Sequence, residues 1–137
     1  MKISFLLLAF LPITWTTNYS TNESNFQKRS KPFVKFVSLK DLIFNKGKYQ
    51  GQIIQTQGYF IERFEERAIY YGNKILKFRN PKKAVWIYFS AKSKRSLNFD
   101  SLSTKFITIK GIVDTTRKGH LDAYSCSLFN ADIISFR

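Results

Sequence analysis

The stretch KYQGQIIQTQGYFIERFEER, residues 48–67, contains the longest alternating pattern of the chain. After Gly51, one face carries Ile54, Thr56, Gly58 and Phe60, and the residues between them face the other way. This period of two indicates a strand with one buried face. Gly58 lies midway along it, where glycine favours a bulge or a sharp coil of the kind found at a barrel corner. The stretch therefore predicts a long, coiled first strand of a small barrel.

A short helix is predicted just before this strand. Ser38 followed by Asp41 is an aspartate variant of the capping box, which marks a helix N-terminus. An apolar stripe at helical spacing follows, formed by Leu39, Leu42 and Ile43. The sequence Asn45-Lys46-Gly47 ends the helix.

Further strands are predicted downstream at residues 68–72, 84–89 and 105–114, and a last strand or strand pair at 123–136. A basic loop at 73–83 and a polar, basic stretch at 90–104 separate them. In the strand 84–89 one face carries Val85, Ile87 and Phe89, and the other carries Trp86 and Tyr88. Ile107 and Ile109 are predicted to face inward. The sequence thus predicts an all-β domain over residues 37–137, a five-stranded barrel preceded by one short α-helix.

The order of these motifs resembles that of a known group of proteins. The helix and first strand read VSLKDLIFNKGKYQGQIIQTQGYF at 37–60, and Ala68-Ile69-Tyr70, Ala84-Val85-Trp86-Ile87, Ile109-Lys110-Gly111 and KGHLDAYS at 118–125 follow. This series resembles OB-fold domains of small exported bacterial proteins of unknown function, over roughly residues 37–134. The resemblance implies an OB-like barrel and no particular task.

The N-terminus is predicted to direct export. Met1-Lys2 is followed by an apolar run from Ile3 to Ile13, and polar residues begin at Thr14. This is the layout of a signal peptide, placed at residues 1–17, and the run is too short to span a bilayer. Residues 18–36 are predicted to be a disordered polar and basic lead. We expect a periplasmic or secreted protein without a transmembrane span in its mature domain; an uncleaved segment would instead retain it at the membrane.

The chain is strongly positive, and its charge is unevenly distributed along the sequence. The net charge is +14, and the segment from Arg67 to Phe99 holds nine lysines or arginines and no acid. Such a region attracts a polyanion, meaning nucleic acid, anionic lipid or an acidic partner. The alternative is a solvated face without a specific ligand.

No constellation for catalysis is apparent. The single cysteine, Cys126, is predicted to be a small buried residue, and the single histidine, His120, to be a turn residue. A Cys126–His120 pair would be the only route to thiol chemistry. Glu62, Glu65 and Glu66 would either hold a hard cation or pair with Arg63, Arg67 and nearby lysines, and pairing is favoured. We therefore expect no enzyme activity, no metal site and no cofactor.

The candidate binding face combines aromatic and basic residues. The second and third strands carry Tyr70, Trp86 and Tyr88, and basic residues flank them: Lys74, Lys77, Arg79, Lys82 and Lys83, then Lys92, Lys94 and Arg95. We expect an interaction module that binds an acidic protein partner, and an inhibitor or immunity-like role would fit. The second hypothesis is a polyanion or single-stranded nucleic-acid binder, since OB folds stack bases on this face. A third alternative has Trp86 and Tyr88 packed as core or cover.

Overall fold

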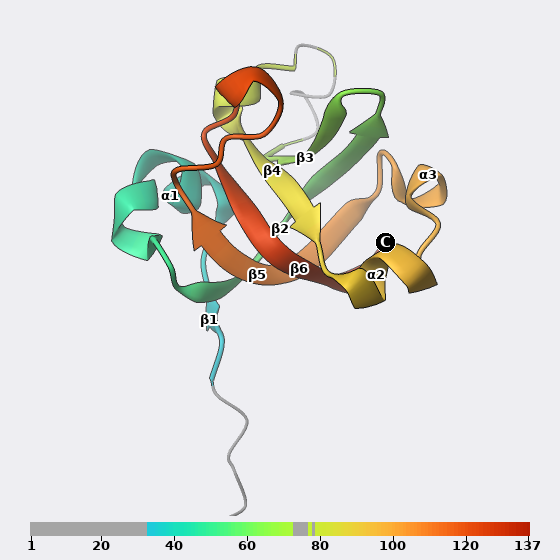
Figure 1. Ribbon diagram of the computed structural model, residues 1–137, viewed down its shortest axis with the longest axis horizontal. Coiled ribbons are helices and arrows are strands. Elements are labelled where there is room, and N and C mark those ends of the chain that lie inside the picture. Colours follow the sequence, from blue (N-terminus) through green and yellow to red (C-terminus); the bar gives the residue numbers. More distant parts are fainter. Residues whose placement is uncertain (1–32, 73–76, 78) are drawn as a thin grey trace, which may run out of the picture. The chain divides into compact units, whose positions relative to one another are not determined.

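The computed structural model describes residues 33–72, 77 and 79–137 and contains a closed five-stranded barrel (Figure 1). Its strands are β2 (Ile53–Arg63), β3 (Glu66–Tyr70), β4 (Ala84–Phe89), β5 (Phe106–Asp114) and β6 (Cys126–Phe136). They pair in the order β2-β3-β4-β6-β5, and β5 returns to β2 to close the barrel. The β4–β6 pair is parallel and the other pairs are antiparallel. The predicted all-β, OB-like barrel is confirmed.

Gly58 marks the corner of the barrel. Strand β2 pairs with β5 over residues 53–59 and with β3 over residues 59–63, so it changes partner next to Gly58. A Cβ on Gly58 would lie 2.7 Å from the Leu39 side chain and 2.7 Å from the Tyr70 carbonyl oxygen. Glycine is needed here because the first helix and β3 approach the β2 backbone closely. The corner is a coil rather than a bulge, because both pairings run without a register shift.

The barrel interior is filled by the alternate residues that the sequence pattern predicted. On β4 the inward residues Val85, Ile87 and Phe89 are buried, and on β5 Ile107 and Ile109 are fully buried. Ile54, Phe60, Ile69, Val113 and Leu128 complete the centre of this core. Burying one such side chain stabilises the fold by about 1.5–3 kcal/mol.

The predicted first helix is α1 (Leu39–Phe44), and Ser38 caps it by accepting a hydrogen bond from the Asp41 backbone N–H. The Asp41 carboxylate accepts hydrogen bonds from the Tyr49 hydroxyl and the Asn45 amide. These bonds, the one from Tyr49 first, lower the pKa of Asp41. They also tie α1 to the following 3-10 turn η1 (Lys46–Tyr49).

Two helices that the sequence did not predict connect β4 to β5. They are α2 (Ala91–Ser96) and α3 (Phe99–Leu102), and Figure 1 shows them on the side of the barrel away from α1. Ser90 caps α2, and the hydroxyls of Ser90 and Ser93 both donate to the Asp132 carboxylate on β6. The Phe99 ring stacks on Phe89 at 4.3 Å between centroids. Each of these helices has only one buried residue, Ser93 in α2 and Leu102 in α3, so neither shows an apolar stripe at helical spacing in the sequence.

The structure contains a short strand before the predicted start of the domain. Strand β1 (Lys35–Phe36) pairs in parallel with residues 54 and 55 of β2, inside the stretch predicted to be a disordered lead. Its backbone extends the edge of β2, whereas both side chains are exposed. Two exposed residues carry no pattern that a sequence analysis could detect. The predicted signal peptide and the rest of the lead lie outside the described residues.

None of the helices within residues 33–72, 77 and 79–137 has the length and apolar content needed to cross a bilayer.

Candidate binding groove

A second, smaller core lies on the outer face of β2, β3 and β4. Tyr70 and Trp86 lie here with Ile61, Ala68 and Ala84, and Tyr124 covers them from the β5–β6 loop. Trp86 and Tyr124 meet edge to face, with ring centroids 4.9 Å apart. The loop crosses Trp86 at Gly119, where a Cβ would lie 2.5 Å from the indole. The loop therefore takes up much of the face on which the sequence predicted a ligand.

Tyr70 is fully buried under this loop, so its ring cannot contact a ligand and we leave it out of the candidate face. Its hydroxyl donates a hydrogen bond of 2.7 Å to Glu66. Burial, helped by this bond to Glu66, raises the pKa of Tyr70 far above its usual value. The sequence predicted the correct face of β3 but gave no sign that the loop would fold back over it.

An open groove remains beside the loop, with a volume of about 440 Å³. It lies between the β2–β3 hairpin and the β5–β6 loop, and Trp86 and Tyr88 from β4 form its aromatic wall. Charged residues of the hairpin and part of the loop line the rest: Glu62, Arg63, Glu65, Glu66, Arg67, Gly119 and His120. The structure thus brings the predicted aromatic pair together with the acidic cluster and His120.

Each of the three glutamates of the groove contacts a basic residue of the protein. Arg67 binds Glu62 through Nε and Nη2, at 2.5–3.1 Å. This hydrogen bonding raises the pKa of Arg67. Arg79 contacts Glu66 at 3.2 Å, and His120 Nε2 lies 3.5 Å from Glu65 Oε2. Of the predicted partners, Arg67 pairs with one of these acids, whereas Arg79 and His120 contact the other two in place of Arg63 and the lysines. Among the described residues no cluster could hold a metal ion, and Arg63 has no ion-pair partner.

The aromatic wall extends onto β6. Tyr88 lies 6.2 Å from Trp86 and 6.3 Å from Phe129, measured between ring centroids, and the Arg117 guanidinium lies over Phe129 at 5.0 Å. Phe129 is 42% exposed and is a member of the face that sequence reasoning missed. Only the pairing of β4 with β6 places it beside Tyr88, and this parallel pairing leaves no local signal in the sequence.

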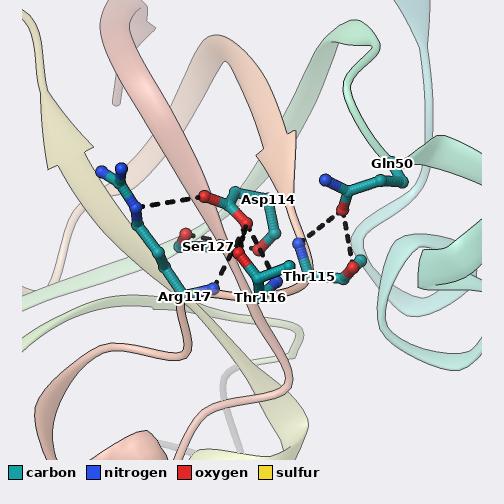
Figure 2. Close-up of polar contacts among 6 residues, drawn as sticks. All are labelled: Gln50, Asp114, Thr115, Thr116, Arg117 and Ser127. Atoms are coloured by element: carbon teal, nitrogen blue, oxygen red, sulfur yellow. Dashed lines mark hydrogen bonds and ion pairs between the residues drawn. The ribbon is translucent and has the colours of Figure 1, made fainter.

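Polar contacts hold the base of the loop that borders the groove (Figure 2). The Asp114 carboxylate accepts hydrogen bonds from the Thr116 hydroxyl at 2.6 Å and from the Thr116 and Arg117 backbone N–H groups at 2.9 and 3.2 Å. It also pairs with the Arg117 side chain. The Gln50 side-chain oxygen accepts from the Thr115 backbone N–H and hydroxyl. An aspartate two residues before a threonine is an Asx-turn signal that could have been used.

The predicted basic residues do not gather along the aromatic wall. Lys74 lies outside the described residues, Arg79 pairs with Glu66, and Lys77 is exposed. Lys82 and Lys83 are exposed in the turn η3 (Pro81–Lys83), at the start of β4. The remaining bases Lys92, Lys94 and Arg95 are on α2, which Figure 1 shows near the far end of β4.

Cys126 and His120 occupy different environments. Cys126 is fully buried in the barrel core, and burial raises the pKa of its thiol to about 12. His120 lies on the turn η4 (His120–Asp122) at the rim of the groove. The predicted burial of Cys126 is confirmed, and the thiol is held in its neutral, unreactive form.

Comparison of the chain with protein-family models, curated proteins and solved structures yields no match.

Proposed function

We propose that this domain is a non-catalytic interaction module of an exported protein, and that it binds a protein partner in the groove beside Tyr88. The observation that supports this most is the open groove of about 440 Å³ between two loops, with an aromatic wall and mixed charges. Tyrosine, tryptophan and arginine are the residues most enriched among energetic hot spots of protein interfaces. An inhibitor or immunity-like role is consistent with such a module.

The lining of the groove favours a polypeptide over a nucleic acid. Three carboxylates line the groove, and the arginines beside two of them, Arg67 and Arg79, are already paired with Glu62 and Glu66. Nucleic-acid binding draws on uncompensated cations along the phosphate backbone. Base stacking also needs a free ring face, whereas Gly119 and Tyr124 pack against Trp86. A protein segment can contact Tyr88, Phe129 and Arg63, because such contacts require neither uncompensated cations nor a free face of the Trp86 ring.

Polyanion binding is the second candidate, and a specific observation favours it. The net charge is +14, and Lys82 and Lys83 are exposed with no ion pair in the part of the chain that the structure describes. This charge can attract any polyanion.

The test uses the immobilised full chain as bait in an envelope extract of the host. We expect a defined partner whose retention falls about tenfold or more for Tyr88→Ala and for Arg63→Glu, as for hot-spot residues. Lys94→Ala on α2 is the control and should retain the partner. A partner held equally by all four proteins would contradict a role for the groove.

A further inference from the structure

Two large apolar side chains project from the rim above the groove. Phe64 is 92% exposed at the tip of the β2–β3 hairpin, and Leu121 is 85% exposed on η4. Their sequence neighbours Glu65 and His120 contact each other at 3.5 Å, which places both tips on the same rim. We call Phe64, Leu121 and the residues beside them the loop rim.

The backbone holds Leu121 outward in a defined conformation. Leu121 has φ of 52°, which bulky residues rarely adopt, and Gly119 has φ of 71°. Backbone bonds from Asp122 to Gly119 and from Tyr124 to Lys118 close the turn, and the Tyr124 side chain is buried beneath it. Phe64 lies in the tight turn between the paired residues Arg63 and Glu66. Both apolar tips are thus presented by ordered turns.

Cations lie beside the β5–β6 loop, on the side of the rim that carries Leu121. The Ser125 backbone N–H donates to the Ala84 carbonyl, so η3 with Lys82 and Lys83 lies beside the end of the loop. Lys46 contacts the Ser125 hydroxyl at 3.4 Å, and Lys118 lies in the loop itself. The nearby acids Glu66 and Asp114 pair with Arg79 and Arg117. Glu65 contacts His120, which is charged only when protonated, and Asp122 has no ion pair among the described residues. The rim is therefore apolar at its tips and positive beside the loop that carries Leu121.

We propose that the loop rim docks onto an anionic lipid surface, with Phe64 and Leu121 entering the interface and the lysines facing the headgroups. Stable but reversible membrane association requires two signals of this kind, an apolar insertion and a basic patch. Each lysine near such a surface strengthens binding by roughly fivefold. Charge complementarity and the projecting shape of the tips favour a lipid surface over a partner's pocket. The proposal concerns the rim and is independent of the partner proposed for the groove.

The first test asks which part of the protein enters the lipid. Leu121→Cys and, separately, Phe64→Cys receive an environment-sensitive fluorophore in the full chain, and Cys126 stays unlabelled because it is buried. Phe44→Cys on α1, where Phe44 is 64% exposed, is the matched control. With vesicles of phosphatidylcholine and phosphatidylglycerol we expect a blue shift at 121 and 64 and none at 44. Vesicles of phosphatidylcholine alone should give no shift at any of the three positions.

The second test distinguishes the effect of the lysines beside the rim from the effect of the protein's net charge. Lys82→Glu with Lys83→Glu should weaken vesicle binding by roughly 25-fold or more. Lys92→Glu with Lys94→Glu makes the same change of charge on α2 and should have a much smaller effect. Every variant keeps residues 1–32, so membrane affinity of the apolar N-terminal run is common to all.

Three results would overturn the proposal. They are no blue shift at 121 and 64 with anionic vesicles, an equal shift at position 44, and equal weakening by the two lysine pairs. A blue shift at 121 caused by an acidic protein but not by vesicles would assign the rim to a protein partner instead, and would overturn the proposal as well.

Discussion

At the scale of single residues, Gly58 shows how an absent side chain shapes the barrel. The helix α1 lies against β2 where a Cβ would meet the Leu39 side chain and the Tyr70 carbonyl, both at 2.7 Å. We predict that Gly58→Ala lowers the free energy of unfolding by about 1–3 kcal/mol, as for other overpacked sites. Gly47→Ala is the control, because nothing lies within 4 Å of its Cβ position. Denaturant melts that show equal stability for both variants would contradict the close approach.

A second residue-scale prediction concerns the inward face of β5. Ile107 and Ile109 are fully buried, so Ile107→Ala and Ile109→Ala should each cost about 2–5 kcal/mol of stability. Lys94→Ala on α2 is exposed and should change stability by less than about 0.5 kcal/mol. Urea titrations compare the three variants. A slip of one residue in register would turn Ile109 outward and make its substitution as mild as that of Lys94.

At the scale of elements, the β5–β6 loop depends on Asp114. Hydrogen bonds, the one from the Thr116 hydroxyl first, lower the pKa of Asp114 below its usual value of 3.8. A lowered pKa means that this carboxylate stabilises the fold above about pH 4, and that the contribution is lost as the pH falls through the folded-state pKa. We predict that Asp114→Asn costs about 1 kcal/mol at neutral pH and flattens the loss of stability in acid.

Thermal melts between neutral and acidic pH measure both effects of Asp114→Asn. Asp100→Asn is the control, because Asp100 on α3 has no side-chain hydrogen bond or ion pair among those of the described chain. If the two variants lose stability in acid alike, Asp114 does not hold the loop as the geometry indicates.

The strands could be predicted from the sequence far better than the loop that packs over their outer face. The strand 84–89 was located to the residue and β5 to within one, because alternation between a buried and an exposed face is a local signal. The burial of Tyr70 was not predictable, since it depends on Tyr124 folding back from a loop more than 50 residues away. Phe129 was missed for a similar reason, because its neighbour Tyr88 lies on a strand distant in sequence. The candidate face was thus predicted by strand and side, but its accessible part is set by long-range contacts.

At the scale of the whole molecule, the part of the chain that the structure describes begins at Phe33. The cores of the barrel and of the outer face consist of residues from Val37 onward, and β1 adds backbone pairing at Lys35 and Phe36. We predict that a chain starting at Phe33 keeps the melting temperature of the full chain. A chain starting at Ser38 should melt lower, because it loses β1, the buried Val37 and the 2.8 Å bond from its N–H to the Gln55 carbonyl. Equal melting temperatures of the two truncated chains would show that β1 and Val37 contribute nothing to stability.

The net charge of +14 belongs to the whole molecule, and it predicts how nucleic acid should bind. We expect affinity for a labelled single-stranded oligonucleotide that falls steeply with salt, because lysines release counterions from any polyanion. Lys82→Glu with Lys83→Glu should weaken this binding. Tyr88→Ala should leave it nearly unchanged, since the groove that Tyr88 lines contains three carboxylates, and Arg67 in it is already paired with one of them. Stacking of a base on Tyr88 would instead contribute roughly 1–3 kcal/mol to binding.

Fluorescence anisotropy near physiological ionic strength, with circular dichroism to verify folding, distinguishes an unchanged affinity from the loss that base stacking predicts. A folded Tyr88→Ala protein that loses about tenfold in affinity would favour the nucleic-acid alternative over a protein partner in the groove.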